Sequence, residues 1–356
     1  MKSARLVEFG SSLQWEETQD PEPKDFEVLL EVISCGVCHS DLHLRDGYYK
    51  IGGDEKLFVK DRGVKLPLTP GHEIVGKILK IGSKVSSVSV GETKLVYPWI
   101  GCETCEECES GNPQLCSAPR SLGIYQDGGY SDRILVPDEK WLLDIYDLSP
   151  EYACSYACAG LTAYGALKKA LPLKRTDSLV IIGAGGLGMF ASQLVPLLTE
   201  AKVIFLDLDE SRLEKLKELG FYTVPSSHPD PASEVKKISG PLGVSAVIDF
   251  VNNSATSSLG FSLLKKNGTL IGVGLFGGEL KIPTPILSLR SLTIRGSYTG
   301  SPGELKEVLQ LVSEKKIRPV PVQVRNLKDA DSALNDLSSG KVLGRLVLSG
   351  KSNSLI

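Results

Sequence analysis

Four cysteines crowd into one short segment of the chain. They are Cys102, Cys105, Cys108 and Cys116, with the spacing C-x2-C-x2-C-x7-C. Four thiolates on such a tight loop can take tetrahedral positions around one zinc ion, each about 2.3 Å from the metal. Because the protein would fill every position, the pattern predicts a structural site. Four reduced thiols without a metal, or an iron site, are the alternatives.

A second set of metal-binding residue types is dispersed. Cys38, His72 and Cys158 stand in the segments Cys-His-Ser-Asp, Gly-His-Glu and Ala-Cys-Ala-Gly. Three such ligands would leave a fourth zinc position open, which is typical of a catalytic metal. The spacing alone leaves open the alternative that these cysteines are inert buried thiols.

A glycine-rich turn follows an apolar run at residues 178–183. Its sequence is Gly183-Ala184-Gly185-Gly186-Leu187-Gly188, which fits G-x-G-x-x-G, and it precedes a predicted helix at 189–198 and a predicted strand at 202–207. In such a unit the glycines allow a tight turn and let a pyrophosphate approach the helix N-terminus. The sequence therefore predicts a dinucleotide site; the alternative is a tight turn without a ligand.

Asp207 ends the second strand, 24 positions after Gly183. A carboxylate there can accept hydrogen bonds from both ribose hydroxyls and would repel a 2′-phosphate. This favours NAD over NADP. Arg212 keeps an alternative open, because its guanidinium could cover the adenine ribose or bind a phosphate.

Further alternating elements extend this unit. The sequence predicts a helix at 210–219, a helix after Ser254, and strands at 246–249, 268–273 and 291–296. The middle of the chain is therefore predicted to be an α/β domain with one doubly wound, parallel Rossmann sheet.

The flanking segments differ in character from this middle part. The first 150 residues show short strands, at 28–32 and 76–81, with Pro and Gly turns and no regular helices. The last 50 residues begin with a predicted helix at 302–315. They end with a strand at 344–348 that is expected to return to the N-terminal domain.

Length and composition exclude several classes. The 356 residues correspond to about two domains. With 42% hydrophobic and 23% charged residues, disorder, collagen and coiled coil are excluded. A net charge of -3 gives no basic surplus for nucleic acid. No apolar run predicts a membrane span and the N-terminus lacks a signal peptide, so a cytoplasmic protein without disulfides is expected.

Three motifs occur in a characteristic order: Gly71-His72-Glu73-x2-Gly76-x5-Gly82, then the cysteine loop, then the Gly183 turn. In this combination the whole chain resembles the zinc-dependent medium-chain alcohol dehydrogenases, and most closely their bacterial and archaeal tetrameric branch. The resemblance implies a mainly-β, GroES-like catalytic domain (1–155 and 300–356) with both zinc sites, and an inserted NAD-binding Rossmann domain (156–299). It also implies a homotetramer, with a homodimer as the alternative.

The resemblance assigns a role to each metal-binding residue. Cys38, His72 and Cys158 match the catalytic zinc ligands. Cys154, one helical turn earlier, is a competing candidate, and Cys158 is preferred for the Gly-Leu-Thr that follows it. Glu73 matches an acid behind the metal.

Other roles follow from the same resemblance. Asp41 would orient His72, and Ser40 and His43 match a proton relay. The implied cofactor contacts are His39, Gly183, Gly185, Gly186, Leu187, Gly188, Asp207, Arg212, Val273, Gly274, Leu275, Ser297, Tyr298, Thr299 and Arg345. For Arg345, a place near Glu73 is the alternative. Trp99 and Tyr125 are expected to line an apolar substrate pocket, with plain core packing as the alternative.

The implied activity is an NAD-dependent alcohol dehydrogenase. It would transfer hydride reversibly from a primary or secondary alcohol to NAD, giving an aldehyde or ketone. A polyol dehydrogenase of the same scaffold and a non-catalytic zinc- and nucleotide-binding protein are the alternatives. The polar stretch at 47–65 is expected to form a lid or a subunit contact.

Overall fold

The computed structural model describes residues 1–314, 317, 320–340, 342 and 344–350. The chain divides into two compact units. Unit 1 comprises residues 1–48, 58–161 and the described residues from 300 onward; unit 2 comprises residues 49–57 and 162–299. The helix predicted at 302–315 ends at Ser313, and Lys315 lies outside the described residues, as do positions 351–356.

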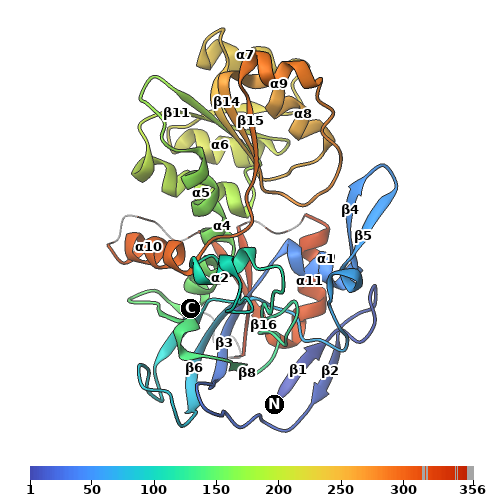
Figure 1. Cartoon of the computed structure of the whole chain (residues 1–356), viewed down its shortest axis with the longest axis vertical. Helices are drawn as coiled ribbons and strands as arrows, with labels where there is room; N and C mark the ends of the chain where they lie inside the picture. Colours follow the sequence, from blue (N-terminus) through green and yellow to red (C-terminus); the bar gives the residue numbers. More distant parts are fainter. Residues whose placement is uncertain (315–316, 318–319, 341, 343, 351–356) are drawn as a thin grey trace. The chain divides into compact units, whose positions relative to one another are not determined.

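Unit 2 is built on a six-stranded sheet in which every pair is parallel. Its strands are β10 (Ser178–Ile182), β11 (Lys202–Asp207), β12 (Tyr222–Pro225), β13 (Val244–Asp249), β14 (Leu264–Gly272) and β15 (Thr293–Gly296), in the order β12-β11-β10-β13-β14-β15. Figure 1 labels β11, β14 and β15 of this sheet. The chain thus builds one half of the sheet outward from β10 and then returns to start the other half at β13. This is the doubly wound order, in which the first βα turn and the reversal between β10 and β13 form the dinucleotide crevice.

Helices accompany this sheet. They are α5 (Gly186–Leu198), α6 (Glu210–Glu218), α7 (Pro231–Ser239), α8 (Ser254–Leu263) and α9 (Thr284–Arg290), while α4 (Ala159–Ala170) begins in unit 1 and continues into unit 2. Helix α6 packs on β11 and β12, whereas α8 packs on β10, β13 and β14. The core of this unit includes Val180, Ile204 and Val247, none of which is exposed. Each such side chain contributes about 1.5–3 kcal/mol through burial.

Unit 1 is built on a mixed sheet in the order β16-β17-β3-β6-β7-β9, with β8 also paired to β3. Figure 1 labels β3, β6, β8 and β16 of this sheet. The strands are β3 (Val28–Val37), β6 (Glu73–Ile81), β7 (Thr93–Val96), β8 (Arg133–Val136), β9 (Leu142–Asp144), β16 (Val322–Asn326) and β17 (Arg345–Ser349), and a separate hairpin joins β1 (Lys2–Arg5) to β2 (Gln14–Glu17). Strand β17 runs antiparallel to β3, with Leu346 opposite Val37. The expectation that the last strand returns to the N-terminal sheet is confirmed.

The expectation that the first 150 residues contain no regular helix is wrong. Helix α1 spans His39–Asp46, and short helices α2 (Glu106–Glu109) and α3 (Pro150–Ala153) follow. The α1 segment is polar and buries only Asp41, Leu42 and Leu44, so it carries no long apolar periodicity. Its ends are instead fixed locally, by a capping box that includes Asp41 and by Gly47 with φ 82°. Later in the chain, α10 (Pro302–Ser313) and α11 (Ala330–Ser338) complete unit 1.

The polar stretch at 47–65 contains a hairpin of β4 (Tyr48–Gly52) and β5 (Glu55–Phe58). Residues 49–57 of this hairpin group with unit 2. There, a Cβ added to Gly277 would lie 2.0 Å from the Lys50 carbonyl oxygen, so the two backbones are in close contact. A role as a lid or subunit contact stays a prediction.

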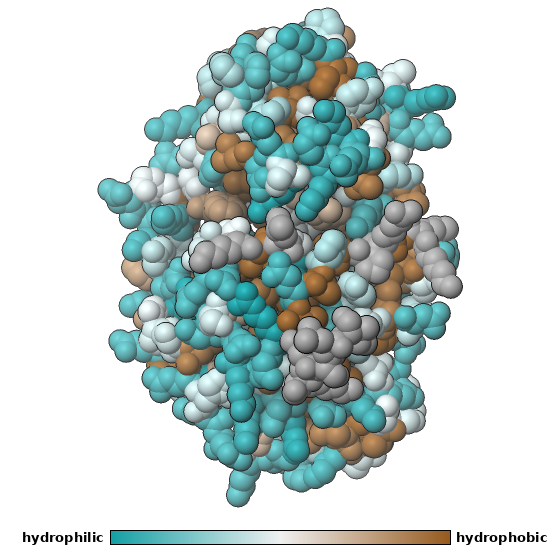
Figure 2. Space-filling model, turned by 180° about the vertical axis from the view of Figure 1, so that it is seen from behind, coloured by the Kyte–Doolittle hydropathy of each residue, from teal (hydrophilic) through white to brown (hydrophobic). Residues whose placement is uncertain are grey.

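The surface carries hydrophilic residues over most of the face in Figure 2, with hydrophobic ones in scattered groups. Isolated exposed apolar residues of this kind are normal for a folded protein. Within the described part of the chain, no helix combines the length and apolar character that a membrane span requires.

Candidate metal centres and cofactor site

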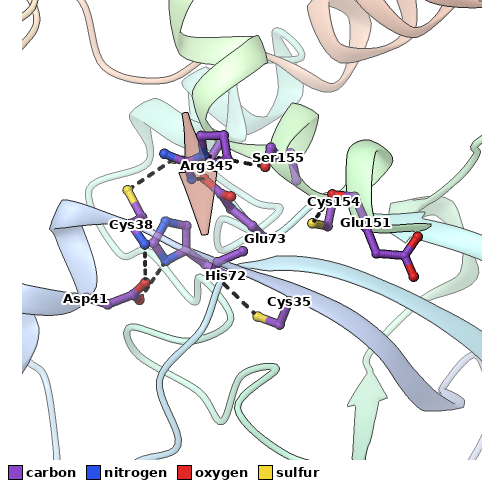
Figure 3. Close-up of polar contacts among 12 residues, drawn as sticks. Cys35, Cys38, Asp41, His72, Glu73, Glu151, Cys154, Ser155 and Arg345 are labelled. Carbon is purple, nitrogen blue, oxygen red and sulfur yellow. Dashed lines mark hydrogen bonds and ion pairs between the residues drawn. The ribbon is translucent and has the colours of Figure 1, made fainter. Parts of the chain in front are cut away.

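Three elements of unit 1 bring the dispersed candidate ligands together. Cys38 follows β3 and caps α1, His72 directly precedes β6, and Cys158 lies between the 3-10 turn Cys154–Ala157 and α4. Ligand atoms of Cys38, His72, Glu73 and Cys158 all lie within 4.8 Å of one another. Figure 3 shows Cys38, His72 and Glu73 converging, with Asp41 on the opposite side of the imidazole.

The environment of His72 fits a metal ligand. Its Nδ1 lies 3.1 Å from Asp41 Oδ1, and both side chains are fully buried. A carboxylate can only accept here, so Nδ1 carries a proton, and in the neutral ring Nε2 presents its lone pair. Nε2 is buried and has no hydrogen-bond partner among the described residues. A bound metal ion would fill this unsatisfied position.

The two thiols of this group lie in direct contact and shift each other's pKa in opposite directions. Cys38 Sγ and Cys158 Sγ are 3.9 Å apart. The hydrogen bond from Cys158 lowers the pKa of Cys38 well below its usual value, and the same contact raises the pKa of Cys158. Burial lowers the pKa of His72, but Asp41 outweighs this and leaves it raised. Metal binding at this group must therefore displace protons.

Glu73 supplies a carboxylate oxygen to the same group from the first residue of β6. It is fully buried, its Oε1 pairs with Arg345 of β17, and its Oε2 has no partner in the described structure. Arg345 Nε also lies 3.4 Å from Ser155 Oγ. Burial raises the pKa of Glu73, although Arg345 opposes this shift. A Cβ on Gly36 would lie 1.9 Å from Glu73 Oε2, so only glycine leaves room for this carboxylate.

Helix α1 carries the residues predicted to move a proton. Ser40 and His43 are three positions apart, which places them on one face of the helix, and both are half-buried. Burial lowers the pKa of His43, and the nearby His39 lowers it further. His43 is therefore neutral near pH 7 and able to accept a proton. His39 is exposed at the start of the helix. These roles stay predictions.

The two predicted pocket residues differ in their placement. The Trp99 ring packs against His72, with 5.1 Å between ring centroids, and its Nε1 donates to the Ala157 carbonyl at 2.9 Å. Trp99 thus borders the metal group directly. Tyr125 is half-buried in the turn at 121–126. That turn approaches the segment before His72, since a Cβ on Gly123 would lie 2.4 Å from the carbonyl oxygen of Gly71.

The four loop cysteines form a second group. Ligand atoms of Cys102, Cys105, Cys108 and Cys116 lie within 4.8 Å of one another. The thiol of Cys116 accepts backbone N–H groups from Cys102 at 3.2 Å and Ala118 at 3.3 Å. This set of four sulfurs with N–H donors fits a closed structural zinc site.

Ion pairs of Glu103 connect the cysteine loop to other parts of unit 1. Glu103, which has φ 68°, pairs with Arg120 at 2.8 Å and with Lys140. The Thr104 hydroxyl lies 3.5 Å from Cys102 Sγ. Hydrogen bonds from Thr104, and further ones from Cys116 and Cys105, lower the pKa of Cys102 to about 6. One thiol of the loop therefore ionises readily before any metal is bound.

The glycine-rich turn in unit 2 has the geometry of a pyrophosphate site. Gly183 follows β10 with φ 100°, a conformation that favours glycine, and Gly185 is the N-cap of α5. A Cβ on Gly188 would lie 2.1 Å from the carbonyl oxygen of Gly183, so the helix packs directly on the turn. The backbone of Gly186 and Leu187, in the first turn of α5, provides N–H groups at the positive end of the helix.

Asp207 lies at the carboxyl end of β11, beside this turn. Its Oδ2 accepts the Ala184 N–H at 2.6 Å and its Oδ1 accepts the Asp209 N–H at 2.9 Å. Arg212 Nη1 lies 3.7 Å from the position of a Cβ on Gly185, and Arg212 Nε pairs with Asp209 at 3.2 Å. Both the carboxylate that favours NAD and the arginine that could bind a phosphate are therefore at the turn.

The residues predicted to frame the nicotinamide follow β14 and β15. The N–H groups of Val273 and Gly274 donate to the Asp249 carbonyl at 3.0 and 3.1 Å. The hydroxyls of Ser297 and Thr299 are buried without a partner among the described residues. Other members of this set, Leu275 and Tyr298, are partly exposed, at 41% and 43%.

Comparison with known proteins decides the family. Residues 24–147 match an alcohol dehydrogenase GroES-like domain, and residues 186–314 match a zinc-binding dehydrogenase. The chain is 39% identical over 350 residues to the NAD-dependent alcohol dehydrogenase of Sulfurisphaera tokodaii, covering 98% of this chain and 99% of the relative. The chain belongs to the zinc-dependent medium-chain alcohol dehydrogenase family.

Solved and curated members of this family agree with the fold. The alcohol dehydrogenase of Aeropyrum pernix superimposes with a TM-score of 0.88 at 33% identity, covering 98% of this chain and 100% of that one. D-arabinose 1-dehydrogenase (NADP(+)) of Saccharolobus solfataricus is 31% identical over 98% of this chain and 97% of its own length. The predicted combination of a GroES-like domain and a doubly wound sheet is confirmed, as are zinc and NAD as the cofactors of the family.

Two residues of this alcohol dehydrogenase family member bear on the sequence predictions, one as a competing candidate ligand and one as a residue that they missed. Cys154 lies outside the metal group; its Sγ donates to the Glu151 carbonyl at 3.4 Å, and burial raises its pKa to about 12 (Figure 3). Tyr130, which sequence reasoning missed, donates its hydroxyl to Asp41 at 2.9 Å. The only signal for it is its place after Gly128-Gly129, two glycines that permit close packing.

Proposed function

We propose that this chain is an NAD-dependent alcohol dehydrogenase that transfers hydride reversibly between a primary or secondary alcohol and NAD. The observation that carries the proposal is the buried group of Cys38, His72, Glu73 and Cys158, in which His72 Nε2 lacks a partner. The dinucleotide turn of unit 2 and the names of the full-length relatives support it.

Cys38, His72 and Cys158 would hold the catalytic zinc, and the cysteine loop would hold a structural one. When bound, zinc polarises the alcohol oxygen and NAD accepts the hydride. Asp41 keeps the proton on His72 Nδ1 and so fixes the ring orientation.

Ser40 and His43 would carry the hydroxyl proton away from the substrate. Ser40 can both accept and donate a hydrogen bond, and the lowered pKa of His43 makes it a proton acceptor near pH 7. The indole of Trp99, packed against His72, excludes water from one side of the group. An apolar wall of this kind favours alcohols with an apolar substituent.

A second candidate function is oxidation of a polyol or sugar with NADP. The relative named D-arabinose 1-dehydrogenase (NADP(+)) motivates it, together with Arg212 at the glycine-rich turn. Asp207 argues against it, because its carboxylate would repel a 2′-phosphate. We favour NAD for this reason.

Formation of NADH or NADPH with a panel of alcohols tests both candidates. The panel contains ethanol, hexanol, benzyl alcohol, cyclohexanol, sorbitol and D-arabinose, each with NAD and with NADP. Turnover of the apolar alcohols with NAD is expected. Turnover of sorbitol or D-arabinose alone, with NADP preferred, would establish the second candidate. A zinc-loaded protein that turns over none of them would refute the enzyme assignment.

A homotetramer is the assembly that we propose, with a homodimer as the alternative. Strand β15 is the edge of its sheet, and all four of its residues are exposed. Exposed apolar residues accompany it, among them Ile294 at 44% and Leu289 at 72%. An open edge of this kind is suited to pairing with a second copy. Light scattering that returns the mass of one chain would refute both assemblies.

A cytoplasmic location completes the proposal. All eight cysteines are free, and six of the sulfurs belong to the two metal groups. Thiols kept for metal binding require a reducing compartment. Fractionation of the producing cells that recovers the protein only outside the cytoplasm would refute this location.

A further inference from the structure

Tyr130 is a fully buried tyrosine whose hydroxyl meets the carboxylate of Asp41. The hydroxyl donates to Asp41 Oδ2 at 2.9 Å, and Cys38 N–H donates to the same oxygen at 3.0 Å. The other oxygen, Oδ1, faces His72 Nδ1 at 3.1 Å. Tyr130 is therefore one of three donors to the carboxylate that orients a candidate metal ligand.

We propose that Tyr130 is a positioning residue for the catalytic metal centre. Its hydroxyl fixes the plane of the Asp41 carboxylate, and the carboxylate in turn fixes the ring of His72. The proposal deepens the proposed function and rests on it, since it assigns the metal to His72 Nε2.

The backbone of Tyr130 acts on His72 by a second route. Residues 128–130 run beside residues 69–71, the segment directly before His72. Gly128 N donates to Thr69 O at 2.7 Å, Gly129 N to Gly71 O at 2.8 Å, and Tyr130 N to Pro70 O at 2.9 Å. The main chain of this segment thus holds the His72 loop, while the Tyr130 side chain reaches Asp41 in helix α1.

Close packing keeps the Tyr130 ring in place. Gly71 has φ 95°, and a Cβ there would lie 2.4 Å from Cδ1 of the Tyr130 ring. The ring therefore lies directly against the backbone of the residue before His72. Burial raises the pKa of Tyr130 well above its usual value, and Asp41 raises it further. The hydroxyl consequently keeps its proton and remains a donor.

Loss of the hydroxyl would free the Asp41 carboxylate without removing the ring. The terminal torsion of an aspartate is soft, so its orientation depends on the donors around it. With Cys38 N–H as its remaining donor, Oδ2 would allow the carboxylate to rotate and the imidazole to follow. Removing a residue that orients a metal-binding histidine typically costs about 10–100-fold in metal affinity. Because Tyr130 acts one step farther out, we expect about tenfold.

Tyr130→Phe in the full-length, zinc-loaded protein tests the proposal. Zinc release to a chelator is measured, and the zinc of the cysteine loop serves as an internal reference. The catalytic site is also loaded with cobalt, whose visible absorption reports ligand geometry. We expect about tenfold weaker zinc binding at the catalytic site, a changed cobalt spectrum and an unchanged loop site.

Tyr97→Phe is the matched control. Tyr97 is also fully buried, and its hydroxyl donates to the Gly300 carbonyl at 2.8 Å, away from Asp41. Its loss removes a buried hydroxyl of the same kind, so it is expected to lower stability while leaving catalytic zinc binding and the cobalt spectrum unchanged. An equal effect from both variants would mean that general packing, rather than positioning of Asp41, is responsible.

A double-mutant cycle with Asp41→Asn separates the route through Asp41 from other effects. If Tyr130 acts through the carboxylate, Tyr130→Phe adds little in the Asp41→Asn background. Additive losses, or a Tyr130→Phe variant with wild-type zinc release and cobalt spectrum, would overturn the proposal. A wild-type protein that binds zinc only in the loop would instead refute the proposed function itself.

Discussion

The buried ion pair of Glu73 and Arg345 gives a prediction whose size follows from its surroundings. The Glu73 side chain is fully buried and that of Arg345 is only 8% exposed. Removing one partner of such a pair costs about 3–5 kcal/mol, because the other charge is left buried without compensation. Since burial already raises the pKa of Glu73, this carboxyl can relieve part of the cost by binding a proton. We expect Arg345→Met to lose about 3 kcal/mol at neutral pH.

The pH dependence of this variant has a defined sign. In the folded variant the pKa of Glu73 lies above its unfolded value, so the folded state binds a proton more tightly. The stability of Arg345→Met therefore increases as the pH falls through that raised pKa. The difference in free energy of unfolding between Arg345→Met and wild type should become smaller over the same pH range.

Two further variants control for the loss of charge and of packing. In Glu73→Gln combined with Arg345→Met the pair is replaced by neutral groups, and stability should return to within about 1 kcal/mol of wild type. Lys80→Met breaks an exposed pair with Glu22, whose side chains are 51% and 71% exposed, and should cost less than about 1 kcal/mol.

Tryptophan fluorescence during urea unfolding is the appropriate assay. The three tryptophans, Trp15, Trp99 and Trp141, all belong to unit 1, which also holds the ion pair. The signal therefore follows the unfolding of that unit. If Arg345→Met loses no more stability than Lys80→Met, the reasoning about the buried pair is refuted.

Four further predictions concern single positions. Cys158→Ala should lose the catalytic zinc and nearly all activity, whereas Cys154→Ala should keep both and lose about 1 kcal/mol of stability. Metal analysis and turnover assays check this; the reverse pattern would assign the third zinc ligand to Cys154. Cys105→Ser should release the loop zinc and lower thermal stability more than it slows turnover, so wild-type stability would contradict a metal clamp. Asp207→Gly should narrow the preference for NAD, measured as the ratio of kcat/KM values; a wild type that prefers NADP would contradict the assignment. Although burial raises it, hydrogen bonds from a lysine and a serine lower the pKa of Asp177 to about 2. The ionised Asp177 carboxylate stabilises the folded state at pH values above its unfolded pKa, and this stabilisation is lost as the pH falls through about 2. Asp177→Asn should therefore lower the free energy of unfolding by about 1 kcal/mol at neutral pH and leave it unchanged below pH about 2.

Strands and the glycine-rich turn of unit 2 could be predicted because their signals are local. The strand at 202–207 was predicted with the bounds that β11 has, since an apolar run between polar residues defines it. Helix α5 begins at Gly186, three residues before the predicted start at Met189. Glycine has low intrinsic helix propensity, so a helix that begins on glycines is hidden from pattern analysis.

For the metal centre, contacts between residues far apart in the chain could not be predicted from the sequence. Residue types and order suggested Cys38, His72 and Cys158, and their ligand atoms lie together. The hydrogen bond of Tyr130 to Asp41 joins positions 89 apart, and nothing in the local pattern indicates it. The resemblance implied two places for Arg345, near the cofactor phosphates or near Glu73. The structure pairs it with Glu73, a contact that depends on β17 lying next to β3 in the folded sheet.

That register has a consequence for how the protein is made. Glu73 and its counter-charge are 272 positions apart in the chain, and β17 occupies an interior place in the sheet, between β16 and β3. While a ribosome is still translating the middle of the message, the N-terminal sheet lacks one of its central strands and the Glu73 carboxylate has no arginine to pair with. Residues 162–299, by contrast, form a nearly continuous unit and can fold as soon as they emerge. The nucleotide-binding unit can therefore fold first, and the Glu73 carboxylate gains its arginine only after residue 345 has left the ribosome.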